Sequence, residues 1–192
     1  LKAALDDTPR KDHRHGIFHA CMPTAQGLAI CRDYHIQLPM QTAFVNWKQE
    51  PDAYLRSILG NRAETLNPVK TIWDMGISVS AGSDGPCTDP NPIAWMEKAC
   101  NTSNSSQAIA PAQALRMCTY NGAYATFDEK ERGSLEIGKI ADMVLLSNNI
   151  LAIPKEEIGT VQVNGLYLQG KRYTPQHQSV VAAILRGILT NE

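Results

Sequence analysis

Hydrophobic positions in the first half of the chain follow two alternating spacings. Short apolar runs typical of buried strands occur at residues 15–20, 36–42 and 77–84. Apolar side chains at helical spacing occur in the stretches between them, at residues 24–34, 52–59 and 68–76. Thr24 is a suitable N-cap for the first helix, whereas Pro39 weakens the second strand. This alternation predicts parallel strands joined by right-handed helical crossovers.

The pattern changes in the second half of the chain. Three helices are expected at residues 93–100, 111–119 and 121–127. Beyond Gly133 the pattern favours strands, at residues 141–146, 161–168 and 171–173, with a hairpin turn at Gln169-Gly170. Ser179 then caps an amphipathic helix. We therefore expect an α/β region over residues 1–130, a β region over 131–175 and a C-terminal helix over 176–192.

The composition narrows the class of protein. Hydrophobic residues make up 43% of the 192 residues and charged residues 19%, which is typical of a globular protein. The net charge is −1, so nothing favours nucleic acid or a membrane surface as a partner. The five cysteines form no CxxC pair and are odd in number, which favours free thiols in a reducing compartment. We expect a cytoplasmic protein.

Two residues are candidates for chemistry because each ends a predicted strand. Asp84 closes the run Ile77–Asp84 just before Gly85-Pro86, and His19 stands near the end of the run at residues 15–20. The carboxyl ends of parallel strands are where α/β proteins place their sites, and imidazole with carboxylate is a suitable ligand pair for zinc. Each residue also has a structural interpretation, since Asp caps helices and turns and a strand histidine often belongs to the core.

Five segments together resemble one family. Residues 14–20 (RHGIFHA) and 82–86 (GSDGP) resemble the sixth-strand histidine and eighth-strand aspartate motifs of the amidohydrolase superfamily. Residues 119–125 (TYNGAYA) resemble the helix after the barrel, and residues 133–144 (GSLEIGKIADMV) its GSLxxGKxADxV signature. Residues 151–158 (LAIPKEEI) are similar to the N-substituted formamide deformylase branch. The signature segment is the most specific of these motifs.

The resemblance implies a fold and a chemistry. It implies strands six to eight of a (β/α)8 TIM barrel, followed by the C-terminal part of a small, composite β-sandwich. It also implies a divalent metal, with zinc expected, bound by His19 and Asp84, and hydrolysis of a small amide-type substrate with Asp84 as the catalytic base. The family's other ligands, from its first, fourth and fifth strands, have no counterpart here. We therefore expect the C-terminal part of a longer enzyme, inactive by itself, that forms homo-oligomers or pairs with the missing N-terminal half.

Two departures from the family pattern limit what the resemblance implies. Phe18 stands where the family often has Glu, and Gly85 where it often has Trp. Because both positions adjoin the expected pocket, substrate specificity does not follow from the resemblance. A non-catalytic binding or scaffolding module of the same family is the alternative. A nucleotide-binding domain is disfavoured, because the chain has neither GxGxxG nor a P-loop motif.

Overall fold

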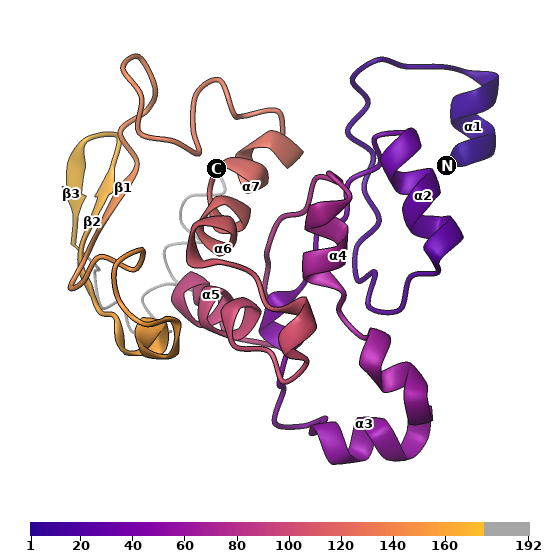
Figure 1. The fold of residues 1–192 in the computed structure, drawn as a ribbon. Coiled ribbons are helices and arrows are strands. Elements are labelled where there is room, and N and C mark those ends of the chain that lie inside the picture. The colour runs from indigo at the N-terminus through magenta and orange to yellow at the C-terminus, as the bar shows by residue number, and fades with distance from the viewer. Residues whose placement is uncertain (175–192) are drawn as a thin grey trace, which may run out of the picture.

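The computed structural model describes residues 1–174 of the chain. The predicted helix after Ser179 lies outside the described residues. Helices α1 and α2 lie at one side of the molecule and a small sheet, β1 to β3, at the other, with α5, α6 and α7 between them (Figure 1). Within residues 1–174, no helix combines the length and the apolar composition that crossing a membrane requires.

The helices form where the apolar spacing predicts them. They are α1 (Lys2–Asp7), α2 (Ala25–Asp33), α3 (Asp52–Leu59), α4 (Val69–Asp74), α5 (Pro92–Cys100), α6 (Pro111–Cys118) and α7 (Tyr120–Ala125). The Thr24 hydroxyl accepts a hydrogen bond from the amide of Gly27 and caps α2, as predicted. Gly60 and Gly76 follow α3 and α4 with positive φ, the left-handed conformation that glycine adopts without steric cost.

Three extended segments lie parallel at the centre of the α/β region. The first pairs with the second through the amide of Ile17 and the carbonyl of Gln37, 2.9 Å apart. The second pairs with the third through the amides of Leu38 and Met40, which donate to the carbonyls of Ser78 and Ser80. Parallel bridges join Gly16 with Gln37 and Met40 with Ala81. The predicted strand order is therefore present, but the ladders are short and irregular.

Pro39 explains why the first ladder is short. In a regular parallel ladder the next bond would run from the amide of residue 39 to the carbonyl of Ile17, and proline has no amide hydrogen. The amide of His19 would then donate to the carbonyl of Pro39. It donates instead to the side-chain oxygen Oε1 of Gln41, at 3.1 Å. The ladder thus ends at Gln37, and the chain is free to turn at His19.

The outer edge of the third segment is closed by the helices that follow it. The amide nitrogen Nδ2 of Asn121 in α7 donates to the carbonyl of Val79 at 2.8 Å. The amide of Ala81 donates to the carbonyl of Met117 at the end of α6, at 3.2 Å. On the opposite border, no partner is found among residues 1–174 for the backbone groups of Gly16 and Phe18. One border of the parallel segments is therefore satisfied and the other is open.

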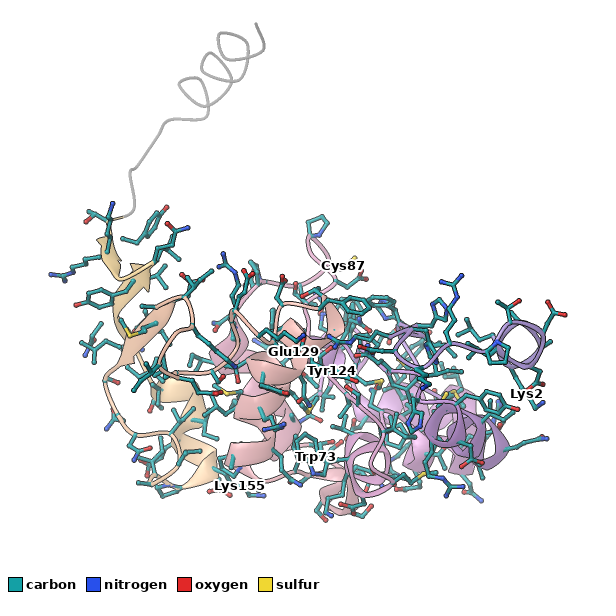
Figure 2. All side chains as sticks on the ribbon, turned by 90° about the horizontal axis from the view of Figure 1, so that it is seen from above. Lys2, Trp73, Cys87, Tyr124, Glu129 and Lys155 are labelled. Carbon is teal, nitrogen blue, oxygen red and sulfur yellow. The ribbon has the colours of Figure 1, made fainter. Side chains whose placement is uncertain are left out.

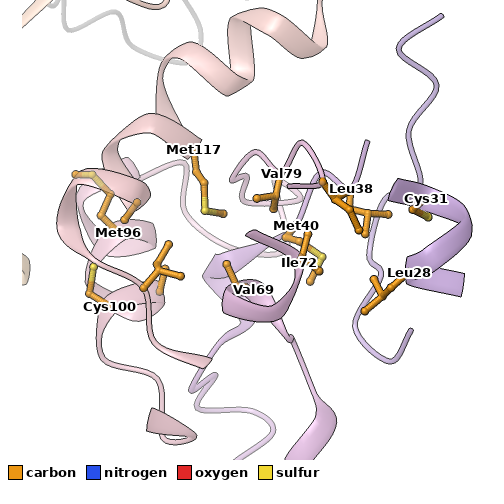
Figure 3. Packing of buried hydrophobic residues seen from close by; sticks show 14 of the residues in the cluster. Leu28, Cys31, Leu38, Met40, Val69, Ile72, Val79, Met96, Cys100 and Met117 are labelled. Carbon is orange, nitrogen blue, oxygen red and sulfur yellow. The ribbon is translucent and has the colours of Figure 1, made fainter. Parts of the chain in front are cut away.

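One hydrophobic core joins the helices to one face of the parallel segments (Figure 3). Leu38 and Met40 of the second segment, Val79 of the third and Ile72 of α4 are at most 1% exposed. The core also reaches Cys100 in α5 and Met117 in α6. The other face is polar, where the hydroxyl of Ser78 donates to Oε1 of Gln37 at 3.4 Å. A sheet with one apolar and one polar face has the helices on the apolar side.

The C-terminal region forms an antiparallel sheet of β1 (Met143–Leu146), β2 (Val163–Leu168) and β3 (Lys171–Tyr173). The hairpin between β2 and β3 turns at Gln169-Gly170, both with positive φ, as predicted from the sequence. A 3-10 helix, Lys155–Thr160, which sequence reasoning missed, packs its buried Ile158 against the core beside α5. This contact attaches the small sheet to the α/β region.

Candidate active site at the ends of the parallel segments

His19 and Asp84 come together at the carboxyl ends of the first and third segments. Their atoms Nε2 and Oδ2 are 3.4 Å apart, and the side chains are 42% and 44% exposed. Each residue has φ of 55°, a left-handed conformation that Asp and His adopt more readily than bulkier residues. Both chains thus turn sharply where the strand ends, and the two side chains meet across the middle segment.

The structural interpretation of Asp84 does not fit its contacts. In the turn after the third segment, the Ser83 hydroxyl accepts from the amide of Gly85, and the Thr88 hydroxyl donates to the Ser83 carbonyl. Within residues 1–174 the carboxylate of Asp84 has no such bond to a turn or helix amide, and its ion-pair partner is His19. The carboxylate is therefore left available to a ligand.

Gln41 is a site residue that the sequence analysis missed. It ends the middle segment, is 8% exposed, and fixes the backbone of His19 through the bond from the His19 amide to Oε1. The signal was present, because Gln41 is a polar residue at the end of a predicted strand, as His19 and Asp84 are. Next to it, the ring of Phe44 lies 5.8 Å from the ring of His19 and forms one wall of the site.

The pair His19 and Asp84 fits two positions of a zinc shell. Zinc bonds to nitrogen and oxygen of ~2.0–2.2 Å place neighbouring atoms of a tetrahedral shell about 3.4 Å apart. The Nε2–Oδ2 distance has this value, and an imidazole with a carboxylate is a common donor set for zinc. Among residues 1–174, no group of three or more His, Cys, Asp or Glu residues converges. Residues 1–174 thus offer two donors, one fewer than a catalytic zinc site takes from protein.

A second feature that sequence reasoning missed is the contact network of Arg14, just before the first segment. Its guanidinium donates to both carboxylate oxygens of Glu129, at 2.6 and 2.8 Å, and lies over the rings of Tyr124 and Phe127. Figure 2 shows Tyr124 and Glu129 close together. The hydrogen bonds from Arg14 lower the pKa of Glu129 to about 2. This clamp fixes the start of the first segment to the region after α7.

Other histidine and cysteine residues have no part in the pair. His35 is exposed at the turn after α2. Burial raises the pKa of the Cys118 thiol to about 12 and of the Cys100 thiol to about 11, and all five cysteines are free thiols. Cys87 is exposed at the edge of the molecule, three residues after Asp84 (Figure 2).

Comparison with known proteins shows which family the chain resembles. The profile of the amidohydrolase family matches residues 1–173. The chain is 31% identical over 134 residues to an N-substituted formamide deformylase of Arthrobacter pascens, a match that covers 66% of this chain and 23% of that protein. It is 30% identical over 132 residues to a 5-methylthioadenosine/S-adenosylhomocysteine deaminase of Caldanaerobacter subterraneus, covering 57% of this chain and 30% of the deaminase. The chain thus spans under a third of these two relatives.

Solved structures share the fold at low sequence identity. An adenosine deaminase from Xanthomonas campestris, with bound zinc, superposes with a TM-score of 0.68 at 18% identity, over 97% of this chain and 44% of that one. A metal-dependent hydrolase from Pyrococcus horikoshii gives a TM-score of 0.62 at 18% identity, over 80% of this chain and 32% of that one. The α/β fold of metal-dependent hydrolases is therefore present in this chain.

Proposed function

Because the chain belongs to the amidohydrolase family, we propose that it is part of a metal-dependent enzyme that hydrolyses a C–N bond in an amide, a formamide or a cyclic amide. The observation that carries this proposal is the approach of His19 to Asp84, 3.4 Å apart at the ends of two separate segments. The relatives, a formamide deformylase and a deaminase, support hydrolysis of a C–N bond.

In this proposal the three parallel segments are strands six to eight of a (β/α)8 barrel. Their parallel order and the helices on one face agree with that placement. We assign β1 to β3 to the C-terminal part of a composite β-sandwich. Val144, Leu145 and Val163 of this sheet are each more than half exposed, as expected for a sheet whose partner sheet is formed by another part of the parent protein.

His19 and Asp84 are the residues that would hold the metal. A divalent ion held there, with zinc expected, would supply a water of lowered pKa and would polarise the carbonyl group of the scissile bond. Asp84 carries a second role, because its carboxylate accepts the proton of the attacking water and passes it to the leaving nitrogen. Gln41 orients His19 through the backbone, and Phe44 excludes water from one side of the imidazole.

The test is Asp84→Asn in the parent enzyme, assayed on a panel of formamides, linear amides and cyclic amides. Asn keeps the shape and accepts the left-handed backbone of position 84, but it is not a base. Loss of a general base lowers kcat by about 10²–10⁴-fold. Asp33→Asn, at an exposed carboxylate that ends α2, is the matched control and leaves kcat unchanged. Near-normal turnover of the Asp84→Asn enzyme with full metal content would show that Asp84 does not have this role.

A further inference from the structure

A hollow of about 430 Å³ lies between two loops at the same end of the molecule as His19 and Asp84. One wall is residues 43–49, which follow the middle segment, and the other is residues 87–98, which follow the third segment and enter α5. Its volume is within the ~300–1,000 Å³ range of pockets that hold small molecules. None of the site residues His19, Gln41 or Asp84 lines it.

Direct contacts connect this hollow to the candidate site on both sides. The ring of Phe44 lies 5.8 Å from that of His19 and packs edge-on against Trp47, 4.9 Å away, and Trp47 lines the hollow. On the other side, the amide of Cys87, which also lines it, donates to the carbonyl of Asp84 at 2.9 Å. The hollow therefore adjoins the candidate site on both sides.

The lining offers two indoles and a surplus of positive charge. Trp47 and Trp95 are half-buried, and the indole nitrogen of Trp95 donates to the carbonyl of Asp89 at 3.1 Å, which fixes its orientation. Lys98 is also half-buried and donates one hydrogen bond to the carbonyl of Ala43. Within residues 1–174, neither Lys98 nor Lys48 forms an ion pair, and Asp89 is the one acidic residue among those that line the hollow.

The environment of Lys98 leaves its charge undercompensated. An ammonium has three donors, and the carbonyl of Ala43 takes one of them. Burial lowers the pKa of Lys98, the charge of Glu97 acts in the opposite direction, and the charge of Lys48 lowers the pKa by a smaller amount. An anionic group at this position would supply the missing counter-charge, and the flat faces of Trp side chains pack well against planar apolar groups.

We propose that this hollow binds the non-reacting part of the substrate, a planar apolar group that carries a carboxylate. The planar group packs against Trp47 and Trp95, and the carboxylate pairs with Lys98. The assignment rests on the proposed function for its link to catalysis, but binding to the hollow is measurable without turnover. It predicts a preference for amides whose amine or acyl part bears both an aromatic ring and a carboxylate.

The probe is 3-phenylpropionate, titrated into the 192-residue chain and followed by tryptophan fluorescence. A Trp73→Phe background leaves Trp47 and Trp95 as the two reporters, because Trp73 lies elsewhere, in α4 against the core. A saturable change in fluorescence is expected. Lys98→Met raises Kd about tenfold or more, since a charge-assisted hydrogen bond is lost, whereas Lys98→Arg keeps most of the affinity. Lys171→Met, at an exposed lysine of β3, is the matched control.

The uncharged amide 3-phenylpropanamide separates the packing of the ring on the two indoles from the pairing of the carboxylate with Lys98. It binds the wild-type chain about as weakly as 3-phenylpropionate binds the Lys98→Met variant, and Lys98→Met does not weaken it further. No saturable change with 3-phenylpropionate, or an equal Kd for the wild type and Lys98→Met, would overturn the proposal.

Kinetics of the parent enzyme then separate this inference from the proposed function. Lys98→Met raises KM for carboxylated amides, leaves kcat unchanged and has no effect on uncharged amides. Hydrolysis without this difference in KM would overturn the hollow's role while the proposed function stands. Binding of the probe without hydrolysis of any amide would contradict the proposed function alone.

Discussion

Asn121 closes the outer edge of the segment that presents Asp84, and we expect its loss to destabilise the chain. In Asn121→Ala the hydrogen bond from Nδ2 to the carbonyl of Val79, 2.8 Å long, is removed. Val79 is 0% exposed, so water cannot replace the missing donor. A buried carbonyl left without a partner costs ~1–3 kcal/mol. Asn121→Asp is expected to be worse, because a carboxylate that faces a carbonyl offers no donor.

The assay is equilibrium unfolding in urea, followed by circular dichroism at neutral pH. With a slope of ~2 kcal/mol/M, a loss of ~1–3 kcal/mol lowers the unfolding midpoint by about 0.5–1.5 M. Asn61→Ala, at an exposed asparagine in the 3-10 turn after α3, is the control and shifts the midpoint by less than about 0.25 M. An Asn121→Ala midpoint equal to that of the control would refute the edge closure by Asn121.

Three further outcomes are expected. Glu129→Gln lowers stability at neutral pH, and it flattens the loss of stability that the wild type shows as pH falls from about 4.5 to about 2. The reason is that the pKa of Glu129 is depressed in the folded state, and equal slopes for both proteins in acid unfolding would contradict it. Ellman's reagent labels exposed Cys87 first and the buried Cys31 and Cys100 last, so a fast phase that survives Cys87→Ser would be inconsistent with the structure. Calorimetry finds weak zinc binding or none to the chain alone, because the part of the chain that the structure describes offers two donors, and submicromolar stoichiometric binding would show a further ligand.

The sequence was sufficient to predict the helix positions and the approach of His19 to Asp84. Apolar spacing with local signals such as Thr24 and Gly60 predicts helix boundaries to within about two residues, because those signals act within one turn. The pairing of His19 with Asp84 also followed, since parallel segments end on the same side.

The rest depends on contacts between residues far apart in sequence. Pro39 was recognised as a weak point of the middle strand. The sequence did not predict that the side chain of Gln41, 22 residues from His19, would accept the hydrogen bond of the His19 amide in place of the Pro39 carbonyl. The clamp of Arg14 on Glu129 spans 115 residues, and no local pattern predicts it. The Lys155–Thr160 turn is short, and its one buried residue, Ile158, is set by packing beside α5. Such contacts form only when the whole chain has folded.

The unequal borders of the three parallel segments also limit how copies of the chain can associate. Head-to-tail growth into a fibre needs an open border on both sides of every copy, and α6 and α7 close one of them. Two copies can still meet through the backbone of Gly16 and Phe18, but a two-fold axis reverses one copy and makes that junction antiparallel. Self-association by this route therefore stops at two, and continuation of the parallel order requires a different stretch of polypeptide.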